Sequence, residues 1–172
     1  FAHSDHLAVF DDLVVDKKDF SDRMQIKFEH CDTYGIDVNE SMRNYLADIY
    51  ALDLSVKKLL EALDELGLRE NTIVVFSSDQ GPGDIKMDDE VYNRVIPFKD
   101  SHRNMMGYSG PYRDGKHKVF EGGLRVPFIV RWPGKVKADS VNTNSVFSGT
   151  DWLPSICQLA GIDAPTDIDG ED

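Results

Sequence analysis

The apolar positions of the chain follow two kinds of spacing, and each kind predicts a different element. Over residues 37 to 66 they recur every three or four residues, which places them on one face of a helix. Asp37 with Glu40 fits a capping box at the start, and Gly67 fits the stop after the end. The positions are Met42, Tyr45, Leu46, Ile49, Leu52, Val56, Leu59, Leu60, Leu63 and Leu66.

Two shorter apolar runs predict strands. Residues 73–76 are mostly β-branched and lack polar alternation, which is typical of a strand covered on both faces. Residues 126–132 predict a second strand, with Pro127 near its start, where a missing N–H is tolerated. A short helix is expected over Trp152–Ala160, closed by Gly161. Helix, tight link and buried strand together predict an α/β fold whose central sheet is mostly parallel and flanked by helices.

The remaining stretches are irregular or incomplete. Residues 81–118 carry glycines, prolines and charges with few periodic apolar positions, which predicts a long insertion of the kind that is usually functional or disordered. The chain starts at Phe1 in what reads as the end of a strand, and it stops in the polar sequence TDIDGED. We therefore expect a segment of a longer protein.

Composition excludes several classes of function. With 172 residues, 41% of them hydrophobic, the chain is sufficient for about one globular domain. Its formal charge of −12 argues against nucleic acid as a partner. No apolar run of roughly 18 residues predicts a membrane span, no signal segment is visible, and nothing indicates an oligomeric state. Cys31 and Cys157 lack a C-x-x-C or zinc spacing, so buried thiols are expected.

Candidate chemistry first appears in the stretch VVFSSDQGPGD, where the apolar run ends in Asp79 and Gln80 before a glycine-proline turn. Ligands collect beyond the carboxyl ends of strands in α/β sheets. A carboxylate and an amide carbonyl are hard oxygen donors that suit Ca²⁺ or Mg²⁺, although Ca²⁺ takes about six to eight such donors. The alternative is that both side chains only satisfy amides of the turn.

A longer pattern relates these residues to a known family. NTIVVFSSDQG, together with GYSGPYRDGKHKVFEGGLRVPFIVRWPGKV at residues 107–136, closely resembles the type I sulfatases of the alkaline-phosphatase-like superfamily. The shared features are Ser-Asp-Gln-Gly, Gly-Pro-x-Arg-x-Gly-Lys, Glu-Gly-Gly-x-Arg-x-Pro and Trp-Pro-Gly, in that order. SGTDWLPSICQLAG and the DGED tail are similar to bacterial N-acetylgalactosamine-6-sulfatase-like enzymes. The resemblance implies that residues 1–172 are the C-terminal portion of a sulfatase catalytic domain.

The resemblance implies roles for particular positions. Asp79 and Gln80 match the late pair of ligands to an active-site Ca²⁺, and Lys116 matches a lysine that contacts the sulfate group. A compact ammonium suits that task because it offsets the charge on sulfate and leaving-group oxygens, although a solvated loop lysine is the alternative reading. Glu121 and Arg125 are expected to play a structural role, holding the insertion's return to the sheet through a charged hydrogen bond.

Three histidines complete the candidate site. The resemblance implies a His-x-x-His pair just after a strand, which His3 and His6 match in spacing, with His6 as proton donor to the leaving alcohol and His3 as a positioning or substrate-binding residue. His117 follows the matched lysine and is expected to line the substrate pocket, unless it is a surface histidine.

The resemblance implies hydrolysis of a sulfate ester, on a carbohydrate or an aryl group, and a location in the periplasm or outside the cell. The family's nucleophile, a formylglycine made from a C/S-x-P/A-x-R motif, and its early metal ligands are absent from the 172 residues. The segment alone is therefore expected to be inactive. Two alternatives stay open: a phosphatase or phosphodiesterase of the same superfamily, and a non-catalytic paralogue that binds sulfated glycans.

Overall fold

The computed structural model describes residues 4–83 and 105–172. His3, one of the expected site residues, lies outside them, as does the middle of the predicted insertion. The chain forms two compact units, Phe1–Val136 and Lys137–Asp172. Among the described helices, none has both the length and the apolar composition to cross a lipid bilayer.

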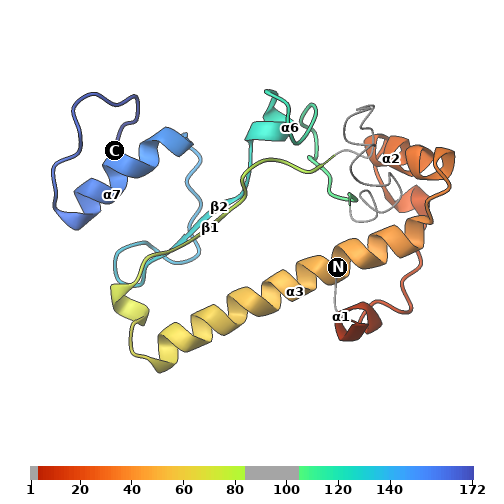
Figure 1. Cartoon of the computed structure of the whole chain (residues 1–172), viewed down its shortest axis with the longest axis horizontal. Helices are drawn as coiled ribbons and strands as arrows, with labels where there is room; N and C mark the ends of the chain where they lie inside the picture. Colours follow the sequence, from red (N-terminus) through yellow and green to blue (C-terminus); the bar gives the residue numbers. More distant parts are fainter. Residues whose placement is uncertain (1–3, 84–104) are drawn as a thin grey trace, which may run out of the picture. The chain divides into compact units, whose positions relative to one another are not determined.

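The long predicted helix is α3, Val38–Glu65 (Figure 1). Its start is capped by the Asp37 carboxylate, which accepts a hydrogen bond from the Glu40 N–H at 2.8 Å. Its end is closed by Gly67 at φ +67°, where Leu68 N–H donates to the Leu63 carbonyl at 2.9 Å. Both predicted ends of this helix are confirmed.

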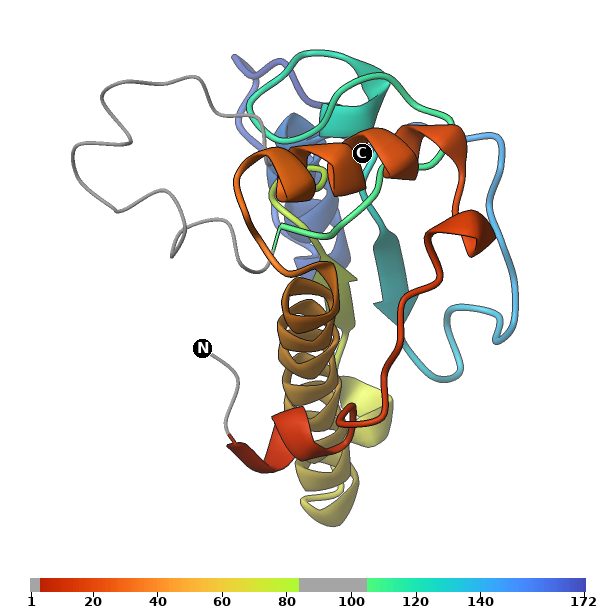
Figure 2. The same ribbon diagram turned by 90° about the vertical axis from the view of Figure 1, so that its right-hand side faces the viewer.

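The core of the first unit lies at one end of α3. Helix α2, Asp22–Thr33, contacts α3 and contributes three of the buried residues. Helix α1, Ser4–Ala8, also contacts α3, near its middle in both ribbon views (Figures 1 and 2). The cluster of buried residues is Met24, Phe28, Cys31, Val38, Met42 and Met106. The buried residues of α3 all precede Tyr50, and the later positions of its apolar stripe are half-buried or exposed.

The two predicted strands are present, but their arrangement differs from the expectation. Strand β1, Val74–Ser77, pairs with β2, Phe128–Arg131, in an antiparallel register that places Val75 opposite Val130. The described residues contain only this pair, so a mostly parallel central sheet is not confirmed. Side chains of β1 are half-buried or exposed, and not covered on both faces as predicted. The long return from β1 through the insertion reverses the chain, which allows antiparallel pairing.

The start of the chain contains a helix that the sequence analysis did not predict. Residues 4–8 form α1, whereas the strand end expected at Phe1 lies outside the described residues. The helix is only five residues long and has no buried residue. Its sequence, SDHLA, begins with Ser4 and Asp5, residue types that favour helix starts.

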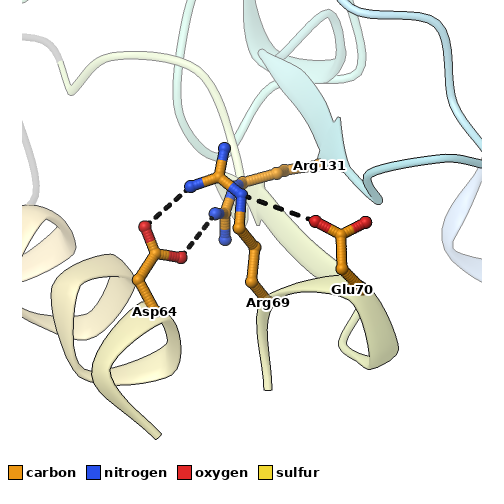
Figure 3. Close-up of polar contacts among 4 residues, drawn as sticks. All are labelled: Asp64, Arg69, Glu70 and Arg131. Carbon is orange, nitrogen blue, oxygen red and sulfur yellow. Dashed lines mark hydrogen bonds and ion pairs between the residues drawn. The ribbon is translucent and has the colours of Figure 1, made fainter. Parts of the chain in front are cut away.

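A cluster of charged side chains joins α3 to the strands (Figure 3). Arg131 of β2 and Arg69 of the short 3₁₀ helix η2, Arg69–Asn71, both donate to the Asp64 carboxylate, at 2.9 and 2.7 Å. The Arg69 Nε also lies 3.8 Å from the Glu70 Oε1. The hydrogen bond from Arg131 is the main cause of a lowered pKa at Asp64, which keeps that carboxyl ionised. The cluster fixes the end of α3 against β2.

The second unit is built around α7, Trp152–Ala160, at the predicted position. Asp151 stands at its N-cap position without a side-chain cap hydrogen bond, and a 3₁₀ turn, η3 at Gly149–Asp151, precedes it. Ser148 and Asp151 form a reciprocal capping box there, and Asp151 also accepts from the Glu171 N–H at 3.1 Å. Gly161 at φ +69° closes the helix as predicted. Cys157 in this unit and Cys31 in the first are buried free thiols, as expected.

Candidate functional site

The candidate site forms where the segment after β1 meets the segment before β2. Main-chain hydrogen bonds join the two: Gly81 N–H donates to the Gly123 carbonyl at 2.9 Å, and Lys116 N–H donates to the Pro82 carbonyl at 2.8 Å. These residues lie more than thirty positions apart in the sequence. Asp79 and Gln80 are therefore held beside Lys116 and His117 by backbone contacts.

Lys116 and Asp79 form the central ion pair. The Lys116 Nζ lies 2.6 Å from the Asp79 Oδ2, with the lysine side chain 36% and the aspartate side chain 74% exposed. The hydrogen bond from Lys116 is the main cause of a lowered pKa at Asp79, so this carboxyl is an anion. An ammonium has three donors, so pairing with one carboxylate oxygen is compatible with binding a further anion.

Gln80 and His117 form a second link beside the ion pair. The Gln80 Oε1 accepts a hydrogen bond from the backbone N–H of His117 at 3.0 Å, and the Ser78 hydroxyl donates to the Gln80 carbonyl at 2.8 Å. His117 has φ +67°, a left-handed conformation that is uncommon for a residue with a side chain. The structure thus brings together Asp79, Gln80, Lys116 and His117, four of the six predicted site residues.

Glycines make this close approach possible. A Cβ at Gly81 would lie 1.8 Å from the Gly122 carbonyl oxygen, and one at Gly115 would lie 2.2 Å from the Pro82 oxygen. At Gly122 it would meet the Asp114 oxygen at 2.0 Å. No side-chain rotation relieves contacts with backbone oxygens, so any larger residue would have to separate the two segments.

Charged side chains brace the turn that carries these glycines. The Arg125 Nη1 donates to the Glu121 Oε2 at 3.1 Å within α6, Glu121–Leu124, which confirms the predicted charged hydrogen bond. Arg125 also lies over the Tyr112 ring at 4.7 Å. Arg113 lies over the Phe120 ring at 3.9 Å. These cation–π contacts hold the loop before Lys116 against the helix after it.

The structure does not bring His6 to this group. His6 lies on α1, where its ring contacts Tyr50 of α3 edge-on, with ring centroids 5.9 Å apart. Helix α1 lies apart from α6 in both ribbon views (Figures 1 and 2). His3 lies outside the described residues. Proton donation by His6 and a positioning role for His3 stay predictions.

The donor set suits part of a calcium site. The Asp79 carboxylate and Gln80 amide are hard oxygen donors on adjacent residues, and the carboxyl is ionised, as a ligand must be. Within residues 4–83 and 105–172, no group of three or more His, Cys, Asp or Glu residues could hold a metal ion. Two donors are fewer than Ca²⁺ requires, so its other ligands would come from elsewhere.

The sequence analysis missed several residues that shape the site. Lys27 of α2 donates to the carbonyls of Gly83 and Gly107, and Arg23 donates to the Tyr112 carbonyl at 2.7 Å. A lysine or arginine on an amphipathic helix usually indicates a solvated face. The clustering of glycines at positions 115, 122 and 123 was the available signal of close backbone packing.

Known proteins are similar to this chain in sequence and in fold. A profile of the sulfatase family matches residues 3–162. N-acetylgalactosamine-6-O-sulfatase from Bacteroides thetaiotaomicron is 37% identical over 119 residues, which cover 69% of this chain and 22% of that protein. Ulvan-active sulfatase from Formosa agariphila is 35% identical, over 77% of this chain and 22% of that protein. The chain spans about a fifth of the length of these relatives.

Solved structures agree at the level of the fold. The crystal structure of Ps i-CgsB in complex with k-i-k-neocarrahexaose superposes with a TM-score of 0.67 at 24% identity, over 99% of this chain and 28% of that one. The family match covers the Ser-Asp-Gln-Gly segment, the Lys116 loop and the Glu-Gly-Gly-x-Arg block in one alignment. The chain therefore belongs to the sulfatase family, whose alkaline-phosphatase-like fold combines helices and strands.

Proposed function

We propose that the complete protein hydrolyses sulfate esters and that this segment supplies its sulfate-binding ammonium. The observation that carries the proposal is the Lys116–Asp79 pair, because it places an ammonium 2.6 Å from an ionised carboxylate at the end of β1. Family membership supplies the reaction type. In the net reaction the S–O bond to the alcohol breaks, the oxygen of a water molecule forms a new bond to sulfur, and a proton of that water goes to the leaving oxygen.

Each residue of the group has a distinct task in this proposal. Lys116 neutralises a sulfate oxygen and the negative charge that grows on the leaving oxygen as the S–O bond breaks. Asp79 holds the ammonium in place and, with Gln80, offers oxygen ligands to Ca²⁺. Bound Ca²⁺ would supply positive charge that draws electrons from the sulfate group. The nucleophile, a formylglycine in this proposal, would come from outside these 172 residues, and His6 stays the proposed proton donor.

Support for a carbohydrate substrate comes from the relatives. Two of them are named as N-acetylgalactosamine-6-O-sulfatase and ulvan-active sulfatase. Steryl-sulfatase from Rattus norvegicus is also 37% identical, so family membership alone leaves the alcohol open. We propose a sulfated carbohydrate as the first candidate substrate and an aryl sulfate as the second. We further propose that the protein acts in the periplasm or outside the cell, as the resemblance implies.

The proposal is tested in the full-length protein with 4-nitrophenyl sulfate and a 6-sulfated N-acetylgalactosamine as substrates. Lys116→Ala should lower kcat/KM by about 10²- to 10³-fold, because a charge-stabilising donor is lost at the reacting group. Lys118→Ala, two residues away on the same loop and exposed, is the matched control and should stay within about twofold. Retention of most kcat/KM by Lys116→Ala would remove this lysine from the site. A wild-type protein that binds sulfated sugars without cleaving them would support the non-catalytic alternative.

A further inference from the structure

Helix α2 contacts the main chain at two points within the insertion, residues 81–118. The Lys27 Nζ donates to the Gly83 carbonyl at 3.1 Å and to the Gly107 carbonyl at 2.5 Å. Gly83 ends the segment that follows β1, and Gly107 begins the segment that leads to Lys116. One half-buried ammonium therefore ties together two stretches that lie 24 residues apart in the sequence.

The two stretches that Lys27 contacts also pack closely against each other. Met106, 2% exposed, is part of the core that includes Met24 and Phe28 of α2. A Cβ at Gly107 would lie 2.8 Å from the Pro82 side chain, so the two segments are in contact at that point. Because Met106 is anchored in the core, Lys27 holds Gly83 against a fixed part of the structure.

The contact between Lys27 and Gly83 is linked to the site through the neighbouring residue Pro82. Gly83 follows Pro82, whose carbonyl accepts the backbone N–H of Lys116 at 2.8 Å. Gly115 leaves no room for a Cβ against the same Pro82 oxygen, at 2.2 Å. A shift of the 82–83 backbone would therefore move Lys116 as well.

A second cation on α2 acts on the same loop. Arg23 lies one turn before Lys27, and its Nη1 donates to the Tyr112 carbonyl at 2.7 Å. Tyr112 in turn carries the cation–π contact with Arg125. Hydrogen bonds from charged donors are among the strong ones, and the two arise from one helix face at a spacing of four residues.

We propose that Lys27 is a positioning residue for Lys116, and that α2 sets the place of the sulfate-binding ammonium through the main chain of Pro82 and Gly83. The inference rests on the proposed function of Lys116. A misplacement of about 1 Å at a reacting group can cost about 10²-fold in rate, so loss of this hold should appear in catalysis more than in stability.

The test combines kinetics with hydrogen exchange in the full-length protein. Lys27→Met keeps the aliphatic stem and removes the donors, whereas Lys27→Arg keeps a charged donor. With 4-nitrophenyl sulfate, Lys27→Met should lower kcat about tenfold or more and change KM less than about threefold. The backbone amides of residues 107–118 should exchange about tenfold faster, with α3 unchanged. Lys27→Arg should recover most of both losses, and Lys58→Met, on an exposed face of α3, should resemble the wild type.

Wild-type exchange at residues 107–118 together with wild-type kcat in Lys27→Met would overturn the proposal. Faster exchange throughout α2 and α3, or failure of Lys27→Arg to rescue, would assign Lys27 a merely structural role and overturn it as well. If Lys27→Met does not fold, Arg23→Leu tests the same hold from an exposed position and should accelerate exchange at residues 107–118. A wild-type protein without sulfatase activity would contradict the proposed function, while the exchange measurements would still decide the role of Lys27.

Discussion

At the scale of single residues, Asp79 meets two demands with one carboxylate. Its Oδ2 accepts from Lys116, and with Gln80 it is one of the two proposed ligands for Ca²⁺. The hydrogen bond from Lys116 lowers the pKa of Asp79, so the group does not need to lose a proton before it binds a cation. The same charge state serves both roles.

The calcium assignment predicts a metal-dependent stability. Addition of Ca²⁺ should raise the Tm of the full-length protein, because an ion that binds only the folded state stabilises it. Asp79→Asn should raise the Kd for Ca²⁺ by more than about tenfold and shrink the rise in Tm, since a neutral amide replaces an anionic ligand. Asp53→Asn, on an exposed position of α3, is the control with the same change in charge. An equal Ca²⁺ response in all three proteins would contradict the assignment.

The glycine contacts predict a position where even a methyl group is excluded. Gly122→Ala places a Cβ about 2.0 Å from the Asp114 carbonyl oxygen, and the backbone must move to relieve it. We expect a loss of about 2 to 3 kcal/mol in the free energy of unfolding, measured by chemical denaturation, together with reduced activity. Gly149→Ala is the matched control, because a methyl group at that position would have no atom within 4 Å. It should change stability by less than about 0.5 kcal/mol, and equal losses in both variants would refute the steric explanation.

At the scale of elements, the ionic cluster of Asp64, Arg69, Glu70 and Arg131 connects three pieces of secondary structure (Figure 3). It holds the last turn of α3 against β2, so it fixes the strand that leads out of the site region. Its charged groups are partly exposed, so the contribution of each ion pair to stability is small.

The cluster predicts a specific pH dependence. The pKa of Asp64 is lowered in the folded protein, so its stabilising contribution is present above its ordinary pKa and is lost as the pH falls through the lower folded value. Asp64→Asn should lower Tm by about 2 °C at neutral pH. The difference from wild type should diminish as the pH falls below about 4. Asp53→Asn serves again as the control, and a difference that grows with acidity would contradict the sign of this effect.

Local sequence signals predicted individual elements better than their pairing. The ends of α3 and α7 follow from Asp37, Gly67 and Gly161, because caps and left-handed glycines act within one turn of the backbone. The antiparallel pairing of β1 with β2 did not follow, because direction depends on how the 50 residues between Ser77 and Phe128 return. The helix at residues 4–8 was also missed, since a five-residue element is too short to show a helical spacing of apolar positions.

At the scale of the whole molecule, the site could be predicted in part. The motifs identified Asp79, Gln80, Lys116 and His117 as candidates, and the structure places them in one group. Lys27 could not be identified in the same way, because its partners are main-chain carbonyls. Every residue type has such a carbonyl, so the contact leaves no motif in the sequence. Side-chain motifs reveal the residues that do chemistry, whereas residues that hold the backbone appear only in three dimensions.

The junction between the two site segments consists mainly of main-chain hydrogen bonds and glycines. Its dimensions therefore depend mainly on the backbone and on the cations of α2 that hold this backbone, and less on the other side chains nearby. Such a junction allows evolution to change substrate preference through neighbouring side chains without rebuilding the charged pair. It also gives protein engineers a rule: exposed residues that make no contact with the junction are open to exchange, whereas its glycines and Lys27 are not.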